Sequence, residues 1–493
     1  MERAAVELPP GRVARNLFVG FGGTLLQRGL AVATTLVLAR GLGEENFGIY
    51  SYVAAYMTVF TFLADLGVER VVTREAGKFP SEAGDLVGDA LLVKGMLCLL
   101  SMVAAVLVSQ RLGLPPLARD CIFVAALGLP ATLERVFRGF LESRFALAHV
   151  FGVSLSASVG FFLAALVCVV RSWPLPRLFW LALGIGWGTV AAYAAVARRA
   201  FGLRISAGRR PLRLFALLRD SWEVGLFGFL FLLVLRVDQL MLLHLRSASE
   251  VGLYSASVRV AETLGLLPEA VVLTLFPLLV RRHTDAPAFR ETYRTAYRTM
   301  GLLFFPLGIS FTCLAPTVLR LLFGSHYVGG STALALLTWN MFFAYTGVVY
   351  LGIFLAEARQ RLLLAVSALT VLVNVALNLL WIPRYGAAGA AGATLAANVA
   401  GFLSWLVVPS TRPYMTACLA ETWKGFLSAA FSLGTVALCL RGEWGRTALA
   451  LALYFALLGL SGGMRRSDWL AFRTFWVEGL GREKRRRAVS PPT

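Results

Sequence analysis

The sequence predicts an all-α integral membrane protein of about fourteen transmembrane helices, arranged as two six-helix bundles and two C-terminal helices. Long apolar runs recur from one end of the chain to the other, and short arginine-rich joints divide them. Hydrophobic residues make up 58% of the 493 residues and charged residues only 15%, whereas a soluble domain carries about 25%. Because lipid offers no water to backbone N–H and C=O groups, these runs should form helices, which bond those groups internally.

The clearest spans are the runs without any Asp, Glu, Lys or Arg, namely Ala148–Val170, Leu178–Ala197 and Thr447–Gly463. A helix of about 18 such residues crosses a hydrocarbon core of about 30 Å. Pro and Gly in the joints mark where neighbouring spans end. In chain order the predicted spans are Asn16–Ala39, Phe47–Gly67, Asp89–Val108, Cys121–Leu141, Ala148–Val170, Leu178–Ala197, Trp222–His244, Val251–Leu279, Thr299–Leu319, Thr332–Ala356, Leu362–Ile382, Ala387–Pro409, Lys424–Leu440 and Thr447–Met464.

The second and eighth predicted spans begin with similar pentapeptides, which indicates an internal repeat. Phe47–Ser51 (FGIYS) is followed 204 positions later by Val251–Ser255 (VGLYS), and the same offset pairs Asp65 with Glu269. Because both pairs have the same predicted orientation in the membrane, the repeat is parallel and its axis follows the membrane normal.

The repeat divides the chain into five predicted segments. Residues 1–200 form the first six-helix bundle, residues 201–221 a basic cytoplasmic linker, and residues 222–410 the second six-helix bundle. Residues 411–464 add two further transmembrane helices, and residues 465–493 form a basic cytoplasmic tail. A cleft between two such bundles is where a transporter places its substrate.

The net charge of +20 comes from Lys and Arg residues that are concentrated in alternate joints, as is typical of membrane proteins. With the N-terminus in the cytoplasm, the joints on that side hold about three times as many Lys and Arg residues as the outside joints. This excess puts both termini in the cytoplasm and supports an even number of crossings. We therefore expect the lipid bilayer, and no nucleic acid, as the partner of these basic residues, including the tail Arg482–Arg487.

Ionisable groups inside apolar spans are costly and need a partner or a wet cavity. Arg28 lies midway along the first span, Arg236 and Asp238 lie on the seventh, and Arg259 and Glu262 lie on the eighth. One interpretation is a hydrated cavity whose arginines bind an anion such as pyrophosphate, because the planar guanidinium binds phosphate oxygens bidentately and stays protonated. The other is internal pairing, of Arg259 with Glu262 and of Arg236 with Asp238 or another neighbour.

Three acids, Asp65, Asp238 and Glu262, are candidates for gating or for carrying a coupling ion, Na⁺ or H⁺. Asp65 lies near the inner end of the second span, and Lys94 is placed at the start of the third. We expect Asn374 and Asn378, on the eleventh span, to form hydrogen bonds between helices.

No enzyme signature is present. The sequence holds no GxxxxGK[ST], HExxH or GxSxG motif, and its outside joints are short. Its six cysteines are scattered, without a CxxC or a Cys/His cluster. The sequence therefore predicts no catalytic residue, no metal centre and no cofactor, and favours a transporter.

Two groups of motifs carry a family resemblance. The stretch Asn16–Gly77 resembles the N-terminal region of polysaccharide-export flippases through Arg40–Gly43 (RGLG), Phe47–Tyr50 (FGIY) and Asp65–Gly67 (DLG). The second group lies in the tenth to twelfth spans and comprises Leu351–Gly352, Glu357–Arg359, Val373–Asn374, Leu377–Leu379, Ile382–Gly386 and Gly389–Thr394. Together with the helix count, the chain resembles the Wzx-type oligosaccharide flippases of the multidrug/oligosaccharidyl-lipid/polysaccharide (MOP) superfamily, whose fold is MATE-like.

The resemblance implies that the protein moves undecaprenyl-pyrophosphate-linked oligosaccharide across the bacterial cytoplasmic (inner) membrane for surface polysaccharide biosynthesis, by alternating access and with an ion gradient. Arg28, Arg236 and Arg259 are expected at the headgroup from their position alone. Two alternatives from the same superfamily stay open, a lipid II flippase and a multidrug exporter driven by Na⁺ or H⁺. An exporter of organic cations should have an acidic or apolar cleft, whereas arginines outnumber acids in these spans.

Overall fold

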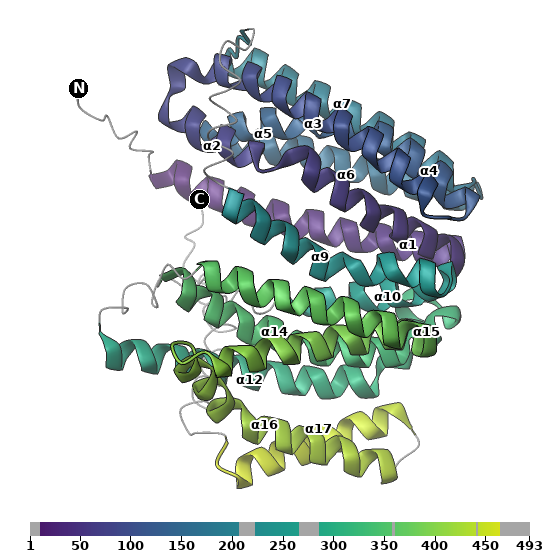
Figure 1. Ribbon diagram of the computed structural model, residues 1–493, viewed down its shortest axis with the longest axis vertical. Helices are drawn as coiled ribbons and strands as arrows, with labels where there is room; N and C mark the ends of the chain where they lie inside the picture. The colour runs from purple at the N-terminus through teal and green to yellow at the C-terminus, as the bar shows by residue number, and fades with distance from the viewer. Residues whose placement is uncertain (1–9, 207–221, 266–284, 357–359, 440–441, 464–493) are drawn as a thin grey trace, which may run out of the picture. The chain divides into compact units, whose positions relative to one another are not determined.

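The computed structural model describes residues 10–206, 222–265, 285–356, 360–439 and 442–463, and every regular element in them is a helix (Figure 1). Six of these helices are long and apolar enough to cross a membrane, and a seventh span is formed if one bent pair counts as a single crossing. The chain is therefore an all-α, multi-pass membrane protein, as predicted. The number of fourteen crossings and the six-six-two division stay predictions.

Two helices are each too long for one crossing. Helix α1 (Pro10–Asp65) has 56 residues and α15 (Gln360–Val407) has 48. At about 1.5 Å per residue either would far exceed a hydrocarbon core of about 30 Å. Each is broken at a glycine in the left-handed region, Gly43 (φ 74°) and Gly386 (φ 55°), which an L side chain disfavours. Each therefore holds two of the predicted spans, joined by a sharp turn.

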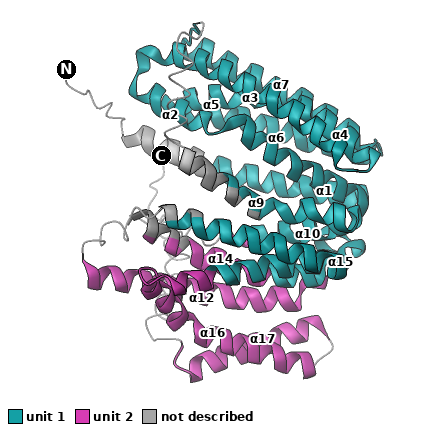
Figure 2. Cartoon of the chain, viewed as in Figure 1, with its two compact units in different colours: residues 1–263, 318–337, 359–401 teal, residues 264–317, 338–358, 402–493 magenta. Residues whose placement is uncertain are grey.

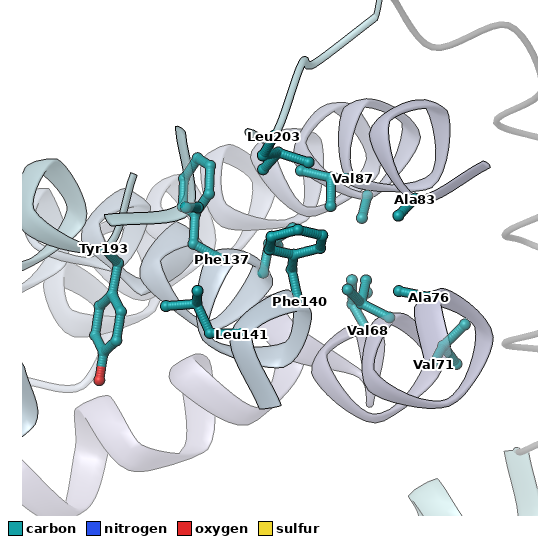
Figure 3. Close-up of a cluster of buried hydrophobic side chains, with 14 of the residues drawn as sticks. Val68, Val71, Ala76, Ala83, Val87, Phe137, Phe140, Leu141, Tyr193 and Leu203 are labelled. Atoms are coloured by element: carbon teal, nitrogen blue, oxygen red, sulfur yellow. The ribbon is translucent and has the colours of Figure 1, made fainter. Parts of the chain in front are cut away.

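The remaining helices of the N-terminal half are α2 (Val68–Lys78), α3 (Ala83–Arg111), α4 (Pro116–Leu127), α5 (Glu134–Ser143), α6 (Leu147–Val170) and α7 (Leu175–Phe201). Of these, α3, α4 and α6 pack on α1, and α2, α5 and α7 pack on those three and on one another. Buried apolar side chains of α2, α3, α5 and α7 form one core, in which Phe137 and Phe140 of α5 face Val68 of α2 and Val87 of α3 (Figure 3). This core joins the four helices through close packing.

In the C-terminal half the helices are α9 (Trp222–Leu245), α10 (Ala248–Leu264), α12 (Ala286–Cys313), α13 (Ala315–Phe323), α14 (Ser331–Ala356), α16 (Arg412–Cys439) and α17 (Glu443–Leu460). A 3₁₀ segment, η3 (Ser325–Gly330), joins α13 to α14.

Two predicted spans are interrupted in the structure, although Pro116–Ser143, which contains the fourth, is still long and apolar enough to cross a membrane as one span. The fourth, Cys121–Leu141, is divided into α4 and α5 by a 3₁₀ turn over Leu129–Leu133, where Pro130 lacks the N–H that a continuous helix needs. The ninth, Thr299–Leu319, ends as α12 at Cys313, and α13 leaves it at 75°. Pro316 lies in the first turn of α13, where its missing N–H costs least.

The chain forms two compact units (Figure 2). The first comprises residues 1–263, 318–337 and 359–401, and the second residues 264–317, 338–358 and 402–493. Within the second unit, α12, α14, α16 and α17 share an aromatic core. The ring centroids of Phe305 and Phe426 lie 4.9 Å apart in it. Gly425 permits this packing, because a Cβ there would lie 2.3 Å from the ring of Phe305.

Candidate functional site

A pocket lies in the first unit, between α1 and the pair α9 and α10. Arg236 of α9 and Arg259 of α10 both line it, so the structure brings together two of the three arginines predicted at the headgroup. Its polar lining comprises Thr35, Tyr50, Ser51, Thr58, Gln239 and Ser255, and the lining residues of this described pocket include no acid. The pocket can therefore bind an anion with polar side chains around two cations.

Arg28, the third predicted arginine, is exposed on α1 and does not line this pocket. It lies seven residues before Thr35, which does line the pocket. Seven residues are close to two helical turns, so Arg28 lies on the same face of α1, about 10 Å further along the helix axis. This places Arg28 beside the pocket along α1 rather than at its wall.

Arg236 has an incomplete set of partners. Its side chain is only 20% exposed, and its Nη1 lies 3.7 Å from Glu262 Oε1. Its Nε is buried and has no hydrogen-bond partner in the described structure. The alternative pairing of Arg236 with Asp238 is wrong, because residues i and i+2 of a helix do not face each other.

Arg259 forms the predicted local ion pair, with its Nη1 3.1 Å from Glu262 Oε2. One carboxylate is therefore shared by two guanidinium groups, since Glu262 also contacts Arg236. The three side chains carry a formal charge of +1, so pairing reduces the positive charge at the pocket without removing it. The pairing interpretation is therefore confirmed for Arg259 with Glu262, and the binding of an anion by these arginines stays a prediction.

Asp238 lies on the other face of α9, in a polar cluster with α10 and α15. It is 2% exposed and accepts hydrogen bonds from Tyr254 Oη (2.5 Å), Thr394 Oγ1 (2.5 Å) and Asn378 Nδ2 (2.6 Å). Asn378 also donates to Asn374 Oδ1 at 3.1 Å. Asn378 therefore bonds α15 to α9, and Asn374 donates to Thr394 across the two halves of α15 at 3.4 Å. Both asparagines bond between predicted spans, as expected, and they do so around a carboxylate.

This cluster is rich in oxygen atoms and short of cations. The side chains that donate to Asp238, those of Tyr254, Asn378 and Thr394, are all neutral. Asn378 Oδ1 is buried and has no hydrogen-bond partner in the described structure. Thr394 Oγ1 and the Ala390 carbonyl lie 3.0 Å apart beside it. Carboxylate, amide, hydroxyl and carbonyl oxygens are the ligands of hard cations, and a buried carboxylate is also a site for a proton.

Asp65 has a different environment. It forms an ion pair with Lys94, whose side chain is fully buried. Lys94 was expected at the start of a helix, but α3 begins at Ala83, so Lys94 lies well inside it. Because Asp65 already has a cationic partner, the structure distinguishes it from Asp238.

Two residues of the Asp238 cluster, Tyr254 and Thr394, were not among the predicted site residues. Each nevertheless belongs to a motif singled out in the sequence, Tyr254 to the repeated pentapeptide and Thr394 to the end of Gly389–Thr394. An uncharged hydroxyl within an apolar helix gave no reason to choose these two over the other Ser, Thr and Tyr residues of the spans.

Solved structures share this fold. A lipid II flippase MurJ in an inward closed conformation superposes with a TM-score of 0.68 at 12% identity, covering 90% of this chain and 98% of its own. An inward-facing multidrug resistance MATE transporter of the MOP superfamily gives 0.61 at 15% identity, covering 80% and 95%. A MOP superfamily transporter from Pyrococcus furiosus gives 0.55 at 13% identity, covering 83% and 95%. At these identities the likeness shows the fold alone.

A search of curated protein sequences finds no significant match. Residues 13–283, more than half of the chain, match the family described as "Polysaccharide biosynthesis protein". The predicted resemblance to Wzx-type flippases of the MOP superfamily is thereby confirmed. The chain is a multi-pass membrane protein that belongs to the polysaccharide biosynthesis protein family.

Proposed function

We propose that the protein flips undecaprenyl-pyrophosphate-linked oligosaccharide across the bacterial cytoplasmic membrane for surface polysaccharide biosynthesis, by ion-coupled alternating access. The observation that carries this proposal is the pocket in which Arg236 and Arg259 share a single acid. A pyrophosphate cannot cross hydrocarbon unaccompanied, whereas a polyprenyl tail can stay in lipid. A basic pocket between helices supplies what the headgroup needs.

The guanidinium of Arg236 suits a phosphate group in particular. Its buried Nε–H has no partner in the described structure, and its Nη1 contact with Glu262 is long at 3.7 Å. A phosphate oxygen would give the Nε–H an acceptor, and a charge-assisted hydrogen bond of this kind is worth about 1.5–3 kcal/mol. Tyr50, Ser51 and Ser255 add hydroxyl groups at the same pocket, where they can bond phosphate or sugar.

Ion coupling is assigned to Asp238. Arg236 and Asp238 lie two residues apart on α9, on different faces, so one helix serves both the pocket and the polar cluster. A second connection runs through α10, where Tyr254 donates to Asp238 and the adjacent Ser255 accepts from Gln239 at 3.1 Å. An ion or proton that binds at Asp238 thereby changes the packing of both helices that carry the arginines. Asp65 and Glu262, which have cationic partners, act in gating and in balancing charge.

Two arginines and no acid are among the described lining residues of the pocket, and this positive charge argues against export of organic cations, which it would repel. A lipid II flippase would use the same basic pocket, because lipid II carries the same undecaprenyl-pyrophosphate anchor. The two flippase functions therefore differ in the glycan, and the test must vary the glycan.

Reconstitution tests the proposal. Purified protein in proteoliposomes should expose undecaprenyl-pyrophosphate-linked oligosaccharide to an external glycosidase, and Arg236→Ala and Arg259→Ala should each slow this about tenfold or more, as expected for a lost charge-assisted bond. Arg177→Ala is the matched control, because Arg177 stacks on Trp173 of the same half, 5.2 Å from the ring centroid, and does not line the pocket. Equal rates for Arg236→Ala and Arg177→Ala would remove the pocket from the mechanism, and faster flipping of lipid II would reassign the cargo.

A further inference from the structure

The two glycines of the repeated pentapeptide meet in the structure. Gly48 of α1 and Gly252 of α10 occupy equivalent positions of the repeat, 204 residues apart. A Cβ on Gly48 would lie 1.8 Å from the Ala248 carbonyl oxygen, and a Cβ on Gly252 would lie 2.1 Å from the Glu44 carbonyl oxygen. Each glycine thus packs on the carbonyl four residues before its counterpart, so the contact is two-fold symmetric about the repeat axis.

Backbones can approach this closely only where neither helix has a side chain. Cα–H groups then lie against carbonyl oxygens, which is a weak but favourable contact. The crossing is adjacent to the pocket, because Phe47, Tyr50 and Ser51 beside Gly48 and Ser255 beyond Gly252 all line it. Two helices in backbone contact leave no passage between them at this level.

Polar contacts also join helices near this crossing. Arg40 donates from Nε to the Leu322 carbonyl at 2.9 Å and from Nη2 to the Leu321 carbonyl. It thereby supplies a cation to the C-terminus of α13, where carbonyls lack partners and the helix dipole is negative. Ser249 Oγ donates to Glu44 Oε1 at 2.7 Å, close to the glycine crossing.

A third polar contact comes from η3. Tyr327 donates to the Ala39 carbonyl at 2.8 Å, one residue before Arg40. All of these contacts join the first predicted bundle to the second, and all lie near the break of α1 at Gly43. Near Asp65, where α1 ends, an aromatic pair also joins the two predicted bundles. The ring centroids of Phe62 and Phe229 lie 5.6 Å apart there.

We infer that the Gly48–Gly252 crossing, together with the Arg40 contact to α13, is the outer gate of the pocket and must part for cargo to leave. The charge distribution puts this end of α1 outside. The gate gives a role to Arg40 of the RGLG motif and to Gly48 of the FGIY motif, neither of which lines the pocket. This inference rests on the proposed alternating access but names no cargo.

Thiol labelling tests the gate without any substrate. In a chain with its six cysteines replaced, Ser51→Cys places one thiol in the pocket, and an impermeant maleimide is added to right-side-out membrane vesicles. The parent should react slowly. Arg40→Ala should raise the labelling rate about tenfold, because loss of bonds to a charged group shifts the open population by that order. Gly252→Ala should raise it as well, because its Cβ cannot fit against the Glu44 carbonyl.

Two control variants make the same chemical changes away from the gate. Arg144 donates to the Pro80 carbonyl at 3.1 Å within the first half, so Arg144→Ala removes a similar bond. Gly84→Ala introduces a similar clash, because its Cβ would lie 2.2 Å from the Arg204 carbonyl oxygen. Neither should change labelling of Ser51→Cys.

The gate is overturned if Arg40→Ala and Gly252→Ala label at the parental rate, or if the two controls rise equally. It is also overturned if the increase occurs only in inverted vesicles. Size-exclusion profiles identify any variant that fails to fold, and Arg40→Ala and Gly252→Ala test the gate independently of each other. A protein that gates in this way and yet fails to flip the lipid-linked glycan would refute the proposed function and leave the gate standing.

Discussion

At the scale of single residues, the site is decided by which charges have partners. Lys94 and Asp65 neutralise each other, whereas Arg236 and Arg259 share Glu262 and Asp238 is surrounded by neutral donors. The sequence identified all the acids and arginines involved. It could not assign their pairing, because partners came from other helices or depended on which face of α9 each residue occupies.

Asp238→Asn should uncouple transport from the ion gradient. The substitution keeps the size of the side chain and its capacity for hydrogen bonds, but removes the charge that would bind Na⁺ or H⁺. Since coupling energies of about 1–3 kcal/mol correspond to about 5–150-fold, gradient-driven flipping should fall within that range towards the rate without a gradient. Flipping in proteoliposomes with imposed pH or Na⁺ gradients measures this and identifies the ion. Asp120→Asn, on the exposed start of α4, is the control, and an unchanged gradient response in Asp238→Asn would contradict the assignment.

Arg28→Ala should abolish complementation of a flippase-deficient strain and leave protein abundance near normal. Arg28 lies on the pocket face of α1, where it can meet the headgroup on its way to Arg236 and Arg259. Surface polysaccharide on the complemented cells measures activity, and immunoblots of membranes measure abundance. Full activity in this variant would remove Arg28 from the transport path.

At the scale of elements, apolar length predicted most helices well. The predicted span Ala148–Val170 corresponds to α6, Leu147–Val170, and Trp222–His244 corresponds to α9, Trp222–Leu245. The helix breaks that the sequence did not predict lie where the surrounding residues stay apolar, as between α4 and α5. Hydropathy averages over such a break, whereas the glycines at the turns in α1 and α15 fall within predicted joints, where flanking charges mark them.

The turn at Gly386 should tolerate substitution less well than the turn at Gly43. Both have positive φ, so alanine costs each about 1 kcal/mol in backbone strain. At Gly43 a Cβ would meet nothing within 4 Å, but at Gly386 it would lie 2.4 Å from Glu250 Oε2. That carboxylate accepts from the Ala387 N–H at 2.7 Å and so caps the second half of α15.

Thermal unfolding in detergent measures this difference. Gly386→Ala should lower the midpoint clearly more than Gly43→Ala, because it loses the cap as well as the backbone preference. Equal midpoints for the two variants would show that Glu250 does not stabilise the turn.

At the scale of the whole molecule, hydropathy and charge were sufficient for the class of protein. Its all-helical, multi-pass architecture was predicted from apolar runs and its family from short motifs; the structural likenesses confirm the fold and the family match confirms the family. The pocket could not be predicted as a place, because its wall combines α1 with α9 and α10, which are distant in sequence. The cargo could not be derived from the residues either, since hydroxyl groups and arginines suit many glycans.

Both termini should lie in the cytoplasm. The excess of Lys and Arg in alternate joints opposes translocation of those joints. A C-terminal alkaline phosphatase fusion should therefore be inactive and a C-terminal fluorescent fusion bright, whereas a phosphatase fused at Gly442, between α16 and α17, should be active. A bright phosphatase signal from the full-length fusion would reverse the assigned topology, and with it the outer placement of the gate.

Arg236 and Asp238 project from different faces of α9. The choice of cargo and the choice of coupling ion can therefore be varied separately by protein engineering. Residues of α9 that face the pocket can be exchanged for those of a relative without disturbing the polar cluster around Asp238 on the opposite face. A chimera built in this way should transport a new lipid-linked glycan and still couple transport to the original ion.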